Sequence, residues 1–182
     1  MKTWIAFLRG INVGGNNSLP MKSLLSIMAD AGCEDARSYI QSGNVVFRSF
    51  ESAPDELAGR ISDAIQSAHG FRPRLMLMEA QDLRRFAGEV PFPASEVDPR
   101  TIHLFFLAQQ PQSPDLEALE ALKSNGEDFA LGEGVFYLFA PSIGRSKLVE
   151  RIDRCLGVET TARNWRTVTK VLEIASAFQP LD

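Results

Sequence analysis

The sequence predicts an α+β fold of two subdomains, and three observations support this fold class. Short apolar runs alternate with longer segments whose apolar residues recur at helical spacing. Glycine and proline stand at most junctions between these segments. An acidic, proline-rich stretch at 87–100 separates two similar successions of elements, which is typical of a domain boundary.

The first half predicts a ferredoxin-like unit, in which strands and helices follow in the order βαββαβ. Each strand is a short run rich in apolar or β-branched residues, and each helix has an apolar stripe that ends at a glycine. A short helix at 80–88 follows. The strands are expected at 4–8, 37–41, 44–49 and 74–79, and the helices at 20–31 and 55–69.

The second half predicts a related βαββα unit, without the last strand, followed by a C-terminal helix. Ser146 is expected to cap its second helix. The strands are expected at 101–108, 128–131 and 135–140, and the helices at 115–124, 146–156 and 165–178. The predicted division is a ferredoxin-like subdomain at 1–86, a linker at 87–100, and a second α+β subdomain with the C-terminal helix at 101–182.

Composition narrows the classes of function. A net charge of −4 over 182 residues gives no overall basic signal for nucleic acid. The apolar runs are too short for a membrane span, so no membrane partner is expected. Cys33 and Cys155 lie outside any C-x-x-C pattern, which favours free buried thiols and a cytoplasmic location.

The segment 9–20 is the most informative part of the chain, because a loop with three glycines and three asparagines follows a buried strand. The predicted topology places this loop, the turn between the second and third strands, and the start of the fourth strand at one edge of the sheet. Glycine-rich turns and helix N-termini present N–H groups, and arginine matches phosphate or carboxylate. The candidate anion-binding residues are Arg9, Asn12, Gly14, Gly15, Asn16, Gln41, Ser42 and Asn44, with Arg72 and Arg74 nearby.

An alternative for this loop is structural, with the amide side chains satisfying the loop's own backbone. Either way, Gly14 or Gly15 is expected at positive φ. The loop matches neither G-x-G-x-x-G nor the P-loop pattern, so the sequence leaves the cofactor unknown.

A second group of candidate ligand-binding residues stands at the start of the final helix, in a region where seven basic residues outnumber three acidic ones. Both groups are expected to face one cleft between the subdomains. The second group consists of Arg163, Asn164, Arg166 and Lys170.

The sequence offers few patterns typical of a catalytic site. His69 is expected to be solvated, His103 lies in an apolar strand, and no grouping of residues has metal-ligand spacing.

Three motifs, at 9–15, 41–47 and 161–168, together resemble the bacterial family catalogued as domain of unknown function 1697. The resemblance extends over essentially the whole chain. It implies an α+β fold of two subdomains, the first ferredoxin-like. It brings no established activity and therefore no residue roles.

The leading hypothesis is a binding protein for a phosphate- or carboxylate-bearing ligand, a nucleotide or nucleic acid among them, held at the cleft. The second is an enzyme on a phosphorylated small substrate, with Arg9 and Arg163 as charge clamps. The third is a scaffold or protein-interaction module whose polar motifs are structural.

Overall fold

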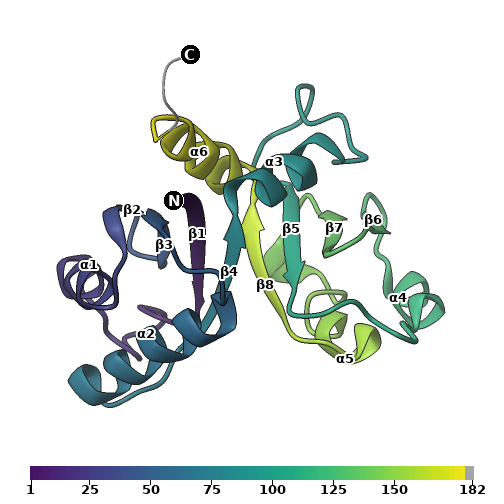
Figure 1. Ribbon diagram of the computed structural model, residues 1–182. Coiled ribbons are helices and arrows are strands. Elements are labelled where there is room, and N and C mark those ends of the chain that lie inside the picture. The colour runs from purple at the N-terminus through teal and green to yellow at the C-terminus, as the bar shows by residue number, and fades with distance from the viewer. Residues whose placement is uncertain (179–182) are drawn as a thin grey trace. The chain divides into compact units, whose positions relative to one another are not determined.

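The computed structural model describes residues 1–178, and the chain divides into two compact units (Figure 1). One unit comprises 1–85 and the segment that begins at Thr169, and the other comprises 86–168. This division differs from the expected one in two places: the end of the final helix belongs to the first unit, and the proline-rich stretch belongs to the second. Each unit is a four-stranded sheet with helices.

The first unit has the predicted βαββαβ order. Its sheet is antiparallel throughout, in the strand order β2-β3-β1-β4. The strands are β1 (Lys2–Arg9), β2 (Glu34–Tyr39), β3 (Asn44–Ser49) and β4 (Arg74–Glu79), and the helices are α1 (Met21–Asp30), α2 (Pro54–His69) and α3 (Ala80–Gly88).

Both faces of this sheet are buried, as the apolar strands predict. Trp4, Leu8 and Phe47 lie on the face that packs against α1 and α2 in one hydrophobic cluster. Ile5 and Phe7 alternate with them along β1, point to the opposite face, and are fully buried as well. The last turns of α6 belong to the same unit.

The second unit repeats the topology, with the strand order β6-β7-β5-β8. It contains a strand that the sequence did not predict: β8 pairs antiparallel with β5, which completes a second βαββαβ unit before the C-terminal helix. The strands are β5 (Ile102–Leu107), β6 (Asp128–Leu131), β7 (Val135–Phe139) and β8 (Thr160–Asn164), and the helices are α4 (Leu116–Leu122), α5 (Ile152–Leu156) and α6 (Trp165–Ser176).

The helix expected at 146–156 is wrong in its first half. A short 3-10 turn, η1 (Ile143–Arg145), precedes an irregular segment, and only Ile152–Leu156 is α-helical. Ser146 is extended, with ψ 120°, and its buried hydroxyl has no hydrogen-bond partner among residues 1–178. Its side chain therefore does not cap the predicted helix.

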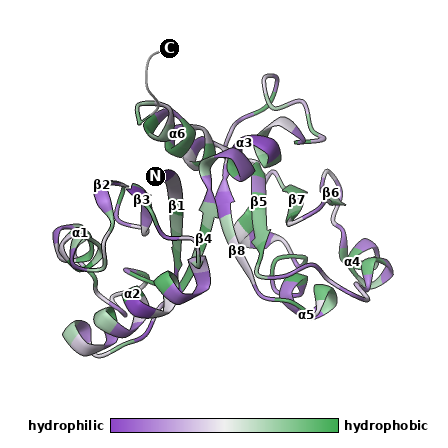
Figure 2. Ribbon diagram, viewed as in Figure 1, coloured by the Kyte–Doolittle hydropathy of each residue, from purple (hydrophilic) through white to green (hydrophobic). Residues whose placement is uncertain are grey.

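The last residues of α3, from Phe86 on, belong to the second unit and contact its sheet. The hydroxyl of Tyr137 donates a hydrogen bond of 2.9 Å to the carbonyl oxygen of Phe86, and the rings of Phe86 and Phe106 lie 5.9 Å apart. Both β5 and β7 are mostly hydrophobic, whereas the helices carry both kinds of residue (Figure 2). Among the helices of residues 1–178, none has the length and hydropathy to cross a membrane.

Candidate functional site

The glycine-rich loop contains a small hairpin of its own. Val13 and Asn16 form an isolated antiparallel bridge, and the amide of Asn16 donates to the carbonyl oxygen of Val13 at 3.0 Å. Gly14 and Gly15 between them have φ of 58° and 80°. Positive φ at both central positions defines a type I′ turn, so the expectation of positive φ is confirmed and has a structural cause.

Asn12 fastens this loop to its surroundings. Its Nδ2 donates to the carbonyl oxygens of Leu19, at 3.0 Å, and of Gln41, at 2.7 Å, while its Oδ1 accepts from the amide of Leu19 at 2.8 Å. One side chain thus joins the two ends of the loop to the β2–β3 turn. The predicted meeting of these two segments is present in the first unit.

Two further asparagines act on the backbone in the same way. Asn17 Nδ2 donates to the carbonyl oxygen of Gly10 at 2.9 Å. Asn44, which is fully buried, donates to the carbonyl oxygen of Tyr39 and to the hydroxyl of Ser42, each at 3.0 Å. These amide groups are used within the loops, which favours the structural alternative for the asparagines.

The arginines at this edge remain accessible. Arg9 and Arg74 are opposite each other at the end of the β1–β4 pairing, and both are exposed. Arg72 is exposed as well, and it forms an ion pair with Asp63, with 2.7 Å between Nε and Oδ1. Two guanidinium groups on directly paired positions therefore stand beside the loop, which is itself exposed at Gly14 and Gly15.

The second group of predicted residues lies at the junction of β8 and α6. Asn164 Oδ1 accepts from the amide of Thr167 at 2.9 Å, as a helix N-cap does. Arg163 is half-buried, and the loss of water around its guanidinium lowers its pKa to about 10. Lys170 forms an ion pair with Glu173 at 2.6 Å. Arg166 is exposed.

These residues do not all belong to the unit that holds Arg9. Arg163, Asn164 and Arg166 are in the second unit, and Lys170 is in the first. The expectation that the two groups serve one cleft stays a prediction.

Neither histidine is fully exposed to solvent. His69 is half-buried, and its Nε2 lies 2.7 Å from the hydroxyl of Ser23, a contact that joins the end of α2 to the start of α1. Sequence reasoning missed this contact, since nothing in the spacing of the two residues indicates that the helix ends meet. His103 is buried in β5, and burial lowers its pKa to about 4. Both cysteines are free; Cys33 is buried and Cys155 half-buried.

Comparison with known proteins places the chain in a family. The sequence model of the family described as "Protein of unknown function (DUF1697)" matches residues 1–137. The chain belongs to this family. The matched range holds the motifs at 9–15 and 41–47, whereas the motif at 161–168 lies beyond it.

A solved structure supports the fold. The conserved bacterial protein SP0830 from Streptococcus pneumoniae superposes with a TM-score of 0.71 at 23% sequence identity, over 96% of this chain and 98% of that one. At this identity, the likeness shows the common fold. Comparison with curated proteins finds no match.

Proposed function

We propose that the protein binds a phosphate- or carboxylate-bearing small molecule at the edge formed by Arg9, Arg74 and the glycine-rich loop. The observation that carries this proposal is the pairing of Arg9 with Arg74 across β1 and β4. Opposed positions on antiparallel strands have Cα atoms about 4.5–5.5 Å apart, so two like charges are held close together. An anion between them would offset their repulsion and accept hydrogen bonds from both guanidinium groups.

The loop supports the same proposal through its rigidity. The side chain of Asn12 holds both ends of the loop, and the type I′ turn sets the conformation at Gly14 and Gly15. A loop already ordered loses little conformational entropy when a ligand binds. The helix that follows, α1, has no side-chain cap and no acidic residue in its first turn, so its N-terminus adds a favourable field for an anion.

The test is a titration of the full chain with inorganic phosphate, and separately with ADP, followed through the NMR amide signals of Gly14 and Gly15. Arg9→Ala and Arg74→Ala should each weaken binding about tenfold or more, because each removes a charge-assisted contact. Arg145→Ala is the matched control, since it removes an exposed arginine of the second unit. Signals that do not saturate, or equal affinity in Arg9→Ala, would contradict the proposal.

Arg163→Ala examines the separate expectation that the second group of cations contributes to the same binding. If it does, this substitution lowers the affinity for phosphate with little change in melting temperature. Unchanged affinity would limit the function to the Arg9 edge.

A purely structural role for the polar motifs is the second candidate, and the backbone hydrogen bonds of Asn12, Asn17 and Asn44 favour it. In that case the protein is a scaffold or a protein-interaction module. Arg9→Ala would then change the melting temperature and leave no phosphate binding to lose. The titration above distinguishes the two.

A further inference from the structure

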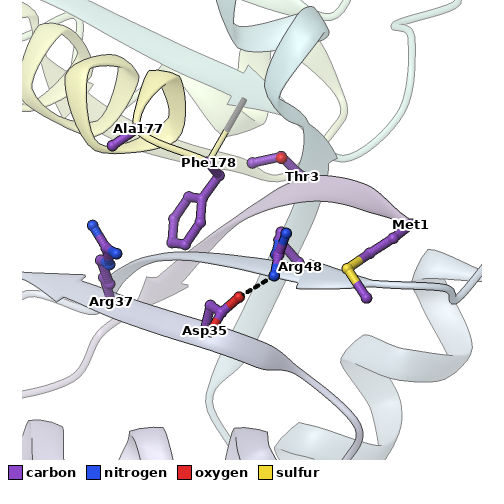
Figure 3. A pocket seen from close by; sticks show the side chains of 7 residues that line it. All are labelled: Met1, Thr3, Asp35, Arg37, Arg48, Ala177 and Phe178. Atoms are coloured by element: carbon purple, nitrogen blue, oxygen red, sulfur yellow. Dashed lines mark hydrogen bonds and ion pairs between the residues drawn. The ribbon is translucent and has the colours of Figure 1, made fainter. Parts of the chain in front are cut away.

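A polar pocket lies in the first unit, between the strands β1, β2 and β3 and the end of α6 (Figure 3). Its volume is about 730 Å3, within the range of ligand sites for small molecules. Arg37, Asp35 and Arg48 line one side, and Ala177 and Phe178 line the other. In Figure 3, the ring of Phe178 points towards the strands, between the two arginines.

An irregularity in β2 builds the charged side of this pocket. The pairing of β2 with β3 shifts register between Glu34 and Arg37, and Asp35 has a φ of 53°. Such bulges re-aim side chains, and aspartate tolerates positive φ better than most residues. Here the bulge brings the carboxylate of Asp35 into an ion pair with Arg48.

Regular pairing beyond the bulge brings in the second cation. Arg37 is opposite Val46, and Arg48 is two residues further along the same strand. Side chains at opposed positions, and at alternate positions of one strand, share a face of the sheet. Both arginines therefore project from the face opposite the one that packs on α1 and α2.

The arginines have unused hydrogen-bonding capacity. Arg37 contacts the ring of Phe178, with 4.7 Å from Cζ to the ring centroid, and among residues 1–178 its guanidinium N–H groups have no hydrogen-bond partner. Arg48 donates to Asp35, but its Nε is buried and has no hydrogen-bond partner among the described residues. A buried donor without an acceptor is costly, so an acceptor delivered by a ligand would be stabilising.

The charge around the pocket suits a single negative charge. Among the lining side chains, two arginines and one aspartate leave a net charge of +1. The C-terminal end of α6 contributes about half a negative elementary charge, which disfavours a dianion such as a phosphate ester. Guanidinium groups bind carboxylates through paired hydrogen bonds, and an aromatic wall favours a flat apolar body.

We propose that this pocket binds a small aromatic or otherwise planar carboxylic acid. The carboxylate accepts hydrogen bonds from Arg37 and Arg48, and the ring packs against Phe178. The pocket lies beside Thr3, at the start of β1, whereas Arg9 is the last residue of that strand. It is therefore a site distinct from the one proposed above, and a substitution can abolish binding at either site without affecting the other.

The probe is benzoate, titrated into the full chain by calorimetry, with acetate and inorganic phosphate as comparison ligands. We expect saturable binding of benzoate, weaker binding of acetate, and little competition from phosphate. Arg37→Gln should weaken benzoate binding about tenfold or more, and Arg145→Gln should leave it unchanged. Phe178→Leu should reduce the affinity for benzoate more than that for acetate.

Asp35→Asn provides a test in the opposite direction. Asparagine also accepts positive φ and keeps the bulge, while the loss of one negative charge should strengthen benzoate binding about threefold or more. A purely structural role for these residues would produce no such gain. The proposal is overturned if benzoate does not bind saturably, if Arg37→Gln binds it equally well, if Asp35→Asn weakens binding, or if phosphate displaces benzoate.

Discussion

Replacing Gly43 by alanine is expected to destabilise the first unit through two separate effects. Gly43 has a φ of 69°, where an L side chain is strained by about 1–2 kcal/mol. A Cβ atom at this position would also lie 2.6 Å from Leu8 Cβ and 2.8 Å from Ile11 Cδ1. The first of these distances cannot be relieved by a side-chain rotation, because Leu8 Cβ is fixed to the backbone of β1.

The overlap adds the cost of overpacking, about 1–3 kcal/mol. The two effects together predict a loss of about 2–5 kcal/mol in the free energy of unfolding. Gly70 is the matched control, because its φ of 79° is similar but nothing in residues 1–178 beyond its chain neighbours lies within 4 Å of the added Cβ. Gly70→Ala should therefore cost only the backbone strain.

Native-state hydrogen exchange of the β1 and β3 amides measures this difference for the first unit alone. Gly43→Ala should speed their exchange about 30-fold or more, since 1.4 kcal/mol corresponds to a factor of ten. The β5 and β7 amides serve as an internal control. Equal effects of Gly43→Ala and Gly70→Ala would refute the close approach of the β2–β3 turn to β1.

Three other predictions follow from single side chains. Asn12→Ala removes three hydrogen bonds and leaves backbone groups of the loop unsatisfied, so the free energy of unfolding should fall by about 1–3 kcal/mol in urea titrations. His103 has its pKa lowered to about 4 in the folded chain, so the unfolded chain binds its proton more readily. The stability that neutral His103 provides is complete above pH 6.5 and declines by about 3 kcal/mol as the pH falls to 4, and His103→Asn should flatten this part of a pH–stability curve. Burial raises the pKa of the Cys33 thiol to about 12, so iodoacetamide at pH 8 should label it only after unfolding, as mass spectrometry would show.

Much of the first unit followed from local patterns. β3, β4 and α3 begin and end where the sequence predicted, and α2 begins one residue earlier, because apolar periodicity, proline and glycine act over a few residues. The same locality determined the positive φ at Gly14 and Gly15. The meeting of the loop with the β2–β3 turn followed from the topology alone.

The candidate sites depended on contacts that no local pattern carries. The sequence identified Asn12 and Asn44 as polar residues at an edge, but only the structure decided that their amides serve the backbone. The pocket of Arg37, Arg48 and Phe178 requires a bulge in one strand and the return of α6 to the first unit. Neither has a signature in the residues that form it.

The sequence by itself therefore determined the order of strands and helices in the first unit, the fold class and the place of the glycine-rich loop. The tertiary structure decided the strand β8, which has no apolar alternation and is a strand because the free edge of β5 supplies its hydrogen bonds. The tertiary structure also decided which charged side chains have hydrogen-bond donors without an acceptor among the described residues. The physical reason is the same in both cases: periodicity records which face of an element is buried, whereas edge pairing and side-chain hydrogen bonds depend on partners distant in the chain.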